Sequence, residues 1–247
     1  MKIAVAGGTG TVGRLVVERV HREGHDAVVL SRAAGVDLHD RAAVDRAVTG
    51  FDAVIDAASI GTTIAATAEE FFRTASGTLL EAAAAAGVGH AVLLSIVGID
   101  RNPHGYYAGK VAQEGLFAQG TVPWSILRAT QFHEFAGQVA AQARLGPLQM
   151  APRARVQPVA AAEVAARLVE LALAGPQGRV ADLAGPREER LDRMIREWVR
   201  RDGSRRLVVP VSLPGGQMRG MRSGANLPSA GATLAGPTFD DWLAAER

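Results

Sequence analysis

The residues best suited to chemistry lie in a short stretch near the middle of the chain. Tyr106 and Tyr107 are its only tyrosines, and Lys110 is one of just two lysines among 27 basic residues. Side chains four residues apart lie on one face of a helix, so the spacing predicts the ammonium of Lys110 beside the phenol of Tyr106. A cation there lowers the pKa of the phenol, which suits a tyrosine that protonates a carbonyl oxygen as hydride reaches the carbon.

A serine precedes this pair by eleven residues. Ser95 stands near the end of the apolar segment 91–96, and ligands bind at the carboxyl ends of strands in parallel sheets. Its hydroxyl is therefore a candidate to polarise the same carbonyl. Lys110, a compact cation, is also a candidate to hold a ribose hydroxyl. Structural roles stay open for all three residues, Ser95 as a partner of backbone groups and Tyr106 with Lys110 as a packing pair.

A glycine-rich segment begins at residue 7, directly after the apolar segment 2–6 and before a helical pattern. Gly7 permits a tight turn, Gly10 lets the backbone approach a pyrophosphate, and Gly13 lets the helix pack closely on the strand. The N–H groups and the positive dipole end of that helix favour phosphate. The pattern GxxGxxG in this context predicts a dinucleotide site, and a glycine turn without a ligand is the alternative. Candidate cofactor-binding residues here are Gly7, Thr9, Gly10, Thr11, Val12 and Gly13.

The end of the second apolar segment indicates which dinucleotide binds. NAD-specific sites carry a carboxylate about 20 residues beyond the loop, where it binds the ribose hydroxyls. This chain has Ser31 and Arg32 there instead. A guanidinium with a hydroxyl suits the 2′-phosphate of NADP(H), so we expect a preference for NADP(H), with NAD(H) left open. In so arginine-rich a chain, an ordinary solvated Arg32 is the alternative.

The elements that must position these residues alternate along the first half of the chain. Short apolar segments typical of buried strands alternate with segments of helical periodicity. This predicts an α/β fold with a Rossmann-type, doubly wound parallel sheet and helices on both faces. We expect strands at 2–6, 27–30, 52–57, 91–96 and 124–127, and helices at 13–23, 40–48, 66–86 and 108–119. Val36–Leu38 also has the apolar pattern of a strand, but it follows Leu30 too closely for an ordinary parallel crossover. Either this crossover is shortened or the strand is vestigial.

Beyond residue 128 the pattern is looser. We expect helices at 132–143, 161–174, 188–200 and 238–246, and strands at 156–159, 179–183 and 206–211. Dense glycine and proline between Pro210 and Pro237 predict loop with at most one short helix. We therefore expect a single domain, 1–247, whose dinucleotide-binding core lies mainly in 1–135. A small C-terminal lobe, mainly 136–247, is expected to bind substrate and to return some elements to the core.

Composition limits the classes of function. The 247 residues carry a net charge of +2, no cysteine and 48% hydrophobic residues. Scattered arginines with balanced charge argue against a nucleic-acid partner, and the lack of cysteine excludes disulfides and thiolate nucleophiles. The sequence has no run of about 18 apolar residues, so no membrane span is expected. The first residues are typical of a strand and not of a signal peptide. We expect a cytoplasmic location and, from the spacing of histidines and carboxylates, no metal site.

Together these motifs resemble the extended and atypical short-chain dehydrogenase/reductase superfamily, and most nearly its NmrA-like NAD(P)H-binding group. The matching segments are GGTGTVG at 7–13, Ser31-Arg32, VDLHD at 36–40, AVIDAAS at 53–59, LLSIVGID at 93–100, YYAGK at 106–110 and PWSILRATQFHEF at 123–135. The chain departs from the superfamily after the fourth strand, where Asp56-Ala57-Ala58-Ser59 replaces an Asn-Ala-Gly segment. Its second helix is also expected to be missing.

The resemblance implies further contacts to the cofactor: Asp37 and Leu38 beside the adenine, Ala57, Ala58 and Ser59 along the ribose side, and Ala129, Thr130 and the residues up to Phe132 at the nicotinamide. Phe132 and His133, with the adjoining Glu134, follow the last core strand and are candidates to face a substrate. A hydrogen-bonded residue at the start of a helix is the alternative for His133.

The activity expected from these residues and from the resemblance is that of an NADP(H)-dependent oxidoreductase. Hydride would pass between the nicotinamide and a carbonyl or other electron-poor small organic substrate, with Tyr106 supplying the proton. Members of the NmrA-like group include reductases and dinucleotide sensors, so a non-catalytic NADP(H) sensor is the alternative. Non-redox uses of the fold, such as epimerases, are a third. The expected partner is a small molecule, with neither nucleic acid nor membrane, and a homodimer stays open.

Overall fold

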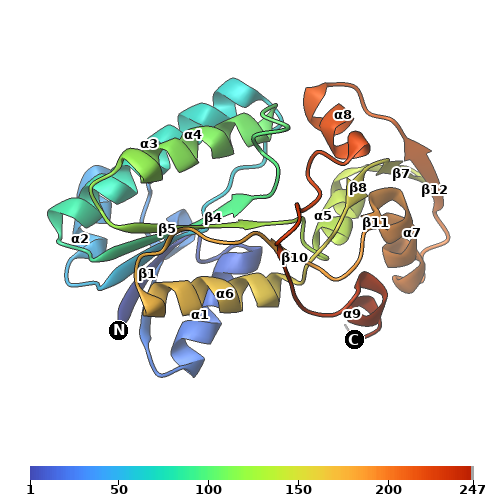
Figure 1. The fold of residues 1–247 in the computed structure, drawn as a ribbon. Coiled ribbons are helices and arrows are strands. Elements are labelled where there is room, and N and C mark those ends of the chain that lie inside the picture. The colour runs from blue at the N-terminus through green and yellow to red at the C-terminus, as the bar shows by residue number, and fades with distance from the viewer. Residues whose placement is uncertain (246–247) are drawn as a thin grey trace. The chain divides into compact units, whose positions relative to one another are not determined.

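A computed structural model describes residues 1–245 of the chain (Figure 1), which divide into two compact units. The first unit comprises Met1–Ser95, Pro103–Arg128 and Ala162–Ala181. The second comprises Ile96–Asn102, Ala129–Ala161 and the chain from Asp182 onward. Among the described residues, no helix combines the length and the apolar character needed to cross a membrane.

The first unit is built on parallel strands in the order β2-β1-β3-β4-β5, with β9 paired to β5. These strands are β1 (Lys2–Ala6), β2 (Asp26–Leu30), β3 (Ala53–Asp56), β4 (His90–Ile96), β5 (Trp124–Ala129) and β9 (Gly178–Arg179). Four of the five residues of β1 and all four of β3 are buried. Burial on both faces explains why these strands are continuous apolar runs instead of alternating ones.

Helices cover both faces of this sheet, with α2, α3 and α4 on one side and α1 and α6 on the other (Figure 1). They are α1 (Thr11–Arg22), α2 (Arg41–Val48), α3 (Ala65–Ala85), α4 (Tyr106–Gln119) and α6 (Ala161–Ala174). Helix α1 exposes its polar face and buries Val12, Val16 and Val20 at helical spacing. Helix α4 differs, because it also buries the polar side chains of Lys110 and Gln113. The expected Rossmann-type α/β fold is confirmed.

The connection from β2 to β3 differs from the expectation. No strand forms at Val36–Leu38; a short 3₁₀ helix, η1 (Arg32–Ala34), and a turn occupy this stretch, and α2 follows. Asp40 caps α2 by accepting a hydrogen bond from the N–H of Ala43 at 3.1 Å. Leu38 is buried in the core, not paired in a ladder. The apolar residues here therefore serve packing. The helix expected at 40–48 is confirmed as α2, which is the crossover between β2 and β3.

The second unit contains short strands and helices. It has a three-stranded sheet of order β12-β7-β6, a two-stranded sheet of β11 and β8, and a parallel pair of β10 and β13. The strands are β6 (Arg144–Leu145), β7 (Leu148–Pro152), β8 (Arg155–Val156), β10 (Leu183–Ala184), β11 (Glu189–Arg190), β12 (Leu207–Val211) and β13 (Thr233–Leu234). The helices are α5 (Phe135–Gln142), α7 (Leu191–Arg201), α8 (Gly216–Ser223) and α9 (Phe239–Ala245).

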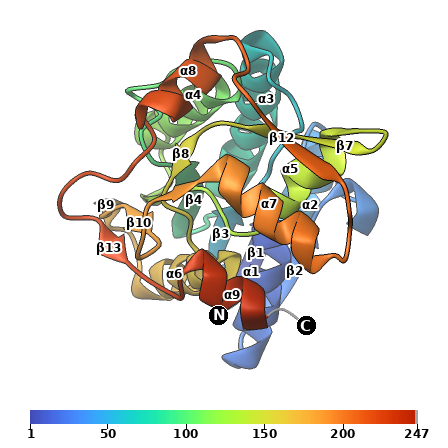
Figure 2. The same ribbon diagram turned by 90° about the vertical axis from the view of Figure 1, so that its right-hand side faces the viewer.

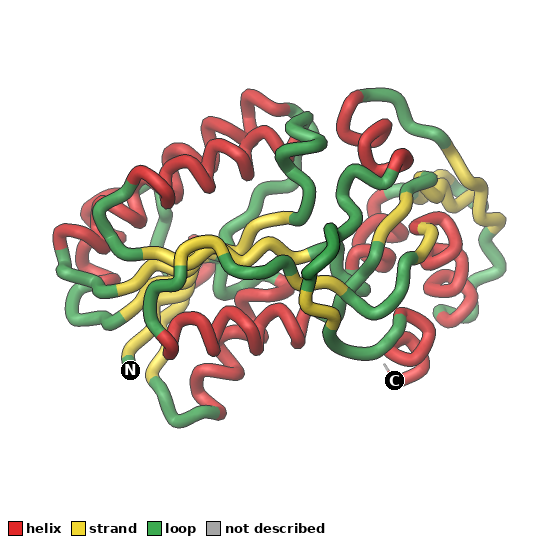
Figure 3. Tube along the Cα trace, viewed as in Figure 1, coloured by secondary structure: helices red, strands yellow, loops and turns green. Residues whose placement is uncertain are grey.

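Helix α7 organises the core of this unit and packs on α5 and β7 (Figure 2). Its buried side chains recur at helical spacing and include Leu191, Met194, Ile195 and Val199. Loop surrounds α8 on both sides, as the glycine and proline content predicts (Figure 3). The expected closing helix begins where predicted, because the hydroxyl of Thr238 accepts a hydrogen bond from the N–H of Asp241 at 3.2 Å. Its predicted last residue, 246, lies outside the described residues.

Candidate active site

The glycine loop joins β1 to α1, and packing explains two of its three glycines. Gly7 has a φ of +72°, and a Cβ there would lie 2.6 Å from the carbonyl oxygen of Ala57. Its N–H donates to the carbonyl oxygen of Leu30 at 3.1 Å. A Cβ on Gly13 would lie 2.1 Å from the carbonyl oxygen of Gly7. Gly7 and Gly13 are thus required by the approach of the loop to β3 and of α1 to the loop.

Gly10 is different, because its Cβ direction is nearly open. A Cβ there would meet a single nearby atom, the carbonyl oxygen of Gly7, at 3.2 Å. Gly10 is also the N-cap of α1, where no side chain caps the helix and the first turn holds no acidic residue. An uncapped helix N-terminus with space in front of it suits an anion. The loop therefore fits the pyrophosphate of a dinucleotide, as the sequence predicts.

The segment after β2 leaves a guanidinium available. Arg32 is exposed and forms no hydrogen bond or ion pair with any described residue. The hydroxyl of Ser31 accepts a hydrogen bond from the N–H of Ala34 at 3.2 Å, which leaves its proton for another acceptor. Asp37, by contrast, is engaged locally: hydrogen bonds from the backbone and ring of His39 lower the pKa of the Asp37 carboxyl.

At the end of β3, a buried carboxylate joins three elements. Asp56 is 1% exposed. One of its oxygens accepts from the N–H of Ala58 at 3.0 Å; the other accepts from the hydroxyl of Ser76 at 2.6 Å and the amide of Gln113 at 2.9 Å. This network was not predicted from the sequence. Its only signal is an apolar strand that ends in an acid, whereas the partners on α3 and α4 are remote in sequence.

Lys110 belongs to this buried network. The side chain is 3% exposed, and its ammonium donates to the carbonyl oxygen of Leu94 at 2.7 Å and to the side-chain oxygen of Gln113. The ammonium also lies 4.8 Å from the centre of the Phe72 ring. Burial lowers the pKa of Lys110 to about 8, against the opposing attraction of Asp56. Its role toward a ribose hydroxyl stays a prediction.

Tyr106 lies at the first turn of α4, where its phenol meets a partner from the loop after β3. The distance between the Tyr106 and Ser59 hydroxyl oxygens is 2.9 Å. The Tyr106 ring packs edge-on against Phe72, with 5.6 Å between ring centres. Burial raises the pKa of Tyr106, while the Ser59 bond acts in the opposite direction. This direction of the Tyr106 pKa is opposite to the lowering expected from Lys110, because desolvation, to which the charge of Asp56 adds, outweighs the Ser59 hydrogen bond.

Two further polar side chains are buried without a hydrogen-bond partner among the described residues. The hydroxyl of Ser95 is one, on a residue only 1% exposed near the end of β4. The other is the carboxamide of Gln131, whose nitrogen and oxygen are both buried. A buried polar atom without a partner is costly, so each is suited to a ligand atom. Gln131 belongs to the segment up to Phe132 that the resemblance places at the nicotinamide, and this contact stays a prediction.

The candidates from Ala129 onward belong to the second unit. The hydroxyl of Thr130 donates to the carbonyl oxygen of Gln157 at 2.6 Å. The Glu134 carboxylate accepts from the N–H of Ala161, at the start of α6, at 3.3 Å. These hydrogen bonds connect the segment after β5 to the chain around β8 and α6. Their part in binding cofactor or substrate stays a prediction.

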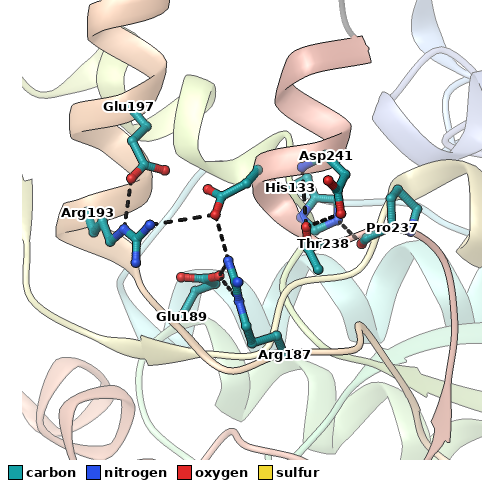
Figure 4. A network of polar contacts seen from close by, with 9 residues as sticks. His133, Arg187, Glu189, Arg193, Glu197, Pro237, Thr238 and Asp241 are labelled. Carbon is teal, nitrogen blue, oxygen red and sulfur yellow. Dashed lines mark hydrogen bonds and ion pairs between the residues drawn. The ribbon is translucent and has the colours of Figure 1, made fainter.

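His133 is completely buried, with its Nε2 3.2 Å from the carbonyl oxygen of Pro237 (Figure 4). The rings of Phe239 and Trp242 pack against it at 5.7 and 5.2 Å. Burial lowers the pKa of His133, which favours the neutral ring. This packing matches the structural alternative for His133, a hydrogen-bonded residue beside a helix start.

Ion pairs in the same view connect α7, β11 and α9 (Figure 4). Arg187 binds both Glu189 and Asp240, the latter at 2.8 Å, and Arg193 binds Glu197 at 2.8 Å. These pairs are partly exposed, so each contributes little by itself. Arg193 also lies 3.6 Å from Asp240, so ion pairs join α9 both to α7 and to the segment just before β11.

The fold and the glycine loop together define a dinucleotide-binding α/β protein of the Rossmann type. The family follows from the sequence: a family described as NAD(P)H-binding matches residues 7–174. The chain belongs to this family. The match begins at Gly7 of the loop and ends with α6, so it includes every strand of the first unit except β1 and β9.

Solved structures share the fold at low sequence identity. The NADPH-dependent quinone oxidoreductase of Escherichia coli in complex with NADPH is 20% identical over 98% of both chains, with a TM-score of 0.73. The UDP-glucose 4-epimerase of Thermus thermophilus in complex with NAD is 18% identical over 100% of both chains, with a TM-score of 0.70. A short-chain dehydrogenase/reductase superfamily protein of Agrobacterium tumefaciens with bound NAD is 17% identical over 99% of this chain and 95% of that one, with a TM-score of 0.66. No curated protein sequence matches the chain significantly.

Proposed function

We propose that the chain is an NADP(H)-dependent oxidoreductase that reduces a carbonyl or another electron-poor small organic compound. The observation that carries this proposal is the glycine loop, where Gly10 is the N-cap of a helix that has no side-chain cap and no acidic residue in its first turn. When bound, the reduced nicotinamide supplies hydride. The chain's own residues then have three tasks: to hold the dinucleotide, to orient the acceptor and to deliver a proton.

Arg32 and Ser31 support the choice of NADP(H). The Arg32 guanidinium is exposed and forms no hydrogen bond or ion pair with a described residue, so a 2′-phosphate can bind it without breaking one. A similar fold occurs in an NADPH-dependent quinone oxidoreductase complexed with NADPH. Quinones are electron-poor carbonyl compounds and therefore belong to the proposed substrate class.

Tyr106 is the proposed proton donor. Burial raises the pKa of Tyr106, so the phenol keeps its proton at neutral pH. As hydride reaches the carbonyl carbon, the phenol proton passes to the carbonyl oxygen and leaves an alcohol. Ser95 is the proposed second hydrogen-bond donor to that oxygen, because its buried hydroxyl has no partner among the described residues.

A non-catalytic NADP(H) sensor is the second candidate, and one observation favours it. The ammonium of Lys110 is engaged with Leu94 and Gln113, and the pKa of Tyr106 is raised, not lowered. A phenol held this way is a weaker acid than a catalytic pair of tyrosine and lysine would provide. A strong preference for either NADPH or NADP+, together with a partner protein that binds only one form, would favour the sensor.

The test is NADPH oxidation with a panel of aldehydes, ketones and quinones, comparing Tyr106→Phe with the wild type. We expect the substitution to lower kcat about 10²–10⁴-fold, the range of a general acid, and to leave NADPH affinity nearly unchanged. Tyr107→Phe is the matched control and should retain activity. Full activity of both variants on an authentic substrate would rule out the tyrosine mechanism.

A further inference from the structure

The loop after β3 brings an exposed hydroxyl to a half-buried phenol. Ser59 is exposed, whereas Tyr106 is largely enclosed by its packing against Phe72 and Tyr107. The two hydroxyl oxygens are 2.9 Å apart, within the range of a normal hydrogen bond. Ser59 therefore offers the half-buried phenol a hydrogen-bonded connection to solvent.

The position of Ser59 is set by buried groups. The preceding residue, Ala58, donates its N–H to the carboxylate of Asp56 at 3.0 Å, and the N–H of Ala57 donates to the carbonyl oxygen of Ala6 at 3.0 Å. The chain on the immediate N-terminal side of Ser59 is thus held by β1 and by the buried carboxylate. A hydroxyl on such a backbone is preorganised and loses little freedom when it binds the phenol.

Lys110 is poorly placed to transfer a proton from water to Tyr106 after the phenol has given up its own. Its ammonium is nearly fully buried and donates to Leu94 and Gln113. A group enclosed in this way exchanges protons with solvent slowly. A serine hydroxyl, in contrast, donates one hydrogen bond while accepting another, so it can pass a proton along.

We infer that Ser59 positions the phenol of Tyr106 and resupplies its proton during turnover. The inference rests on the proposed reductase function. In each cycle the O–H bond of Tyr106 breaks as its proton forms the new O–H bond of the alcohol. The phenolate then takes the proton of Ser59, and Ser59 takes one from water. Hydride supplies the electron pair, so the cycle consumes one solvent proton for each carbonyl reduced.

The pairing is tested first in the protein without cofactor. Tyrosine labelled at Cζ gives one resonance per residue, and the Tyr107→Phe background leaves only that of Tyr106. The Ser59 bond lowers the pKa of Tyr106, so Ser59→Ala should move the titration of this resonance to higher pH. Ser59→Thr, which keeps the hydroxyl, should restore it. The charged groups on the elements packed around the phenol, Asp56 and Lys110, are unchanged in both variants.

Thr63→Ala is the matched control, since it removes an exposed hydroxyl from the same loop. It should leave the resonance and its titration as in the wild type. Identical titrations of Tyr106 in the Ser59→Ala variant and the parent would overturn the pairing. A thermal melt of each variant shows whether the fold is retained.

Turnover then tests the supply of protons. Ser59→Ala should lower kcat about tenfold or more, but less than the roughly 10²–10⁴-fold expected when Tyr106→Phe removes the acid. It should also increase the solvent deuterium isotope effect on kcat. NADPH affinity should stay constant, whereas a Ser59 that served only the ribose would change affinity. An unchanged kcat and isotope effect would overturn the proton supply. If even the wild type reduces no carbonyl, the reductase function fails together with the proton supply, and the titration alone decides the pairing.

Discussion

The side chains of Tyr106 and Lys110 are four residues apart on α4, yet they have different partners. The phenol binds Ser59, and the ammonium binds Leu94 and Gln113. The Phe72 ring contacts both side chains. Helical spacing places two residues on the same face but does not determine where their terminal atoms find partners. At the scale of the residue, the environment of each group therefore decides its chemistry.

Arg32 is expected to set the preference between the two dinucleotides. Arg32→Ala should weaken NADPH binding by about 1–3 kcal/mol, because one charge-assisted hydrogen bond to the 2′-phosphate is lost, and should hardly affect NADH. Calorimetric titration of both cofactors measures the difference. Arg22→Ala, in the last turn of α1, is the control for the loss of one positive charge. Equal weakening of NADPH and NADH binding would show that Arg32 does not bind the 2′-phosphate.

At the scale of the element, the site depends on where strands end and helices begin. The loop between β1 and α1 is the clearest case, since packing requires Gly7 and Gly13 but not Gly10. The ends of β3 and α4 are a second case: Asp56 connects the loop after β3 to Ser76 on α3 and Gln113 on α4. The same residues that hold these elements together also position Ser59 and Lys110.

Replacing Gly10 is expected to abolish dinucleotide binding without unfolding the protein. A valine there would occupy the space that the pyrophosphate needs, while meeting only one nearby backbone atom. Gly13→Ala provides the contrast, because its Cβ would overlap the loop backbone and should lower the melting temperature. Fluorescence titration with NADPH and thermal melts separate the two effects. Undiminished affinity in a folded Gly10→Val variant would place the cofactor elsewhere.

The buried Lys110 predicts a pH dependence of stability. Folding lowers the pKa of Lys110 from about 10.5 to about 8. Between these values the unfolded chain holds a proton that the folded chain has released, so stability rises with pH. Lys110→Met should remove this rise. Urea unfolding at several pH values measures this rise in the free energy of unfolding. The range starts at pH 8 and stays below about pH 10, where tyrosine in the unfolded chain ionises. An equally steep rise in Lys110→Met would contradict the assignment.

At the scale of the whole molecule, the chain combines a parallel α/β unit with a second unit of short elements. The first carries the glycine loop and the tyrosine, and the second carries Gln131, His133 and the helices α7 and α9. The NAD(P)H-binding family match covers residues 7–174 and therefore does not reach the last part of the second unit.

The aromatic cluster around α9 should stabilise the second unit. Trp242 is 9% exposed and packs against His133, Phe239 and Trp198. Trp242→Ala should lower the free energy of unfolding by about 3–5 kcal/mol, the usual range for a buried tryptophan. Leu207→Ala, at a side chain 65% exposed in the same unit, should change it by less than about 0.5 kcal/mol. Denaturant unfolding compares the two, and similar losses would show that α9 contributes little.

The sequence by itself determines the strands β1 to β5, the helices of the first unit and the glycine loop. These features depend on local apolar periodicity and on backbone conformations that only glycine adopts easily. Val36–Leu38 is the exception, because a short apolar run packs equally well from a turn as from a strand.

Only the tertiary structure decides the partners of the polar side chains. Tyr106 and Ser59 are 47 residues apart, Gln113 and Asp56 are 57 apart, and His133 and Pro237 are 104 apart. Desolvation at these positions depends on which elements cover them, so the pKa directions of Tyr106, Lys110 and His133 follow from packing. A motif specifies which groups are present, whereas burial and distant partners specify their proton affinity and orientation.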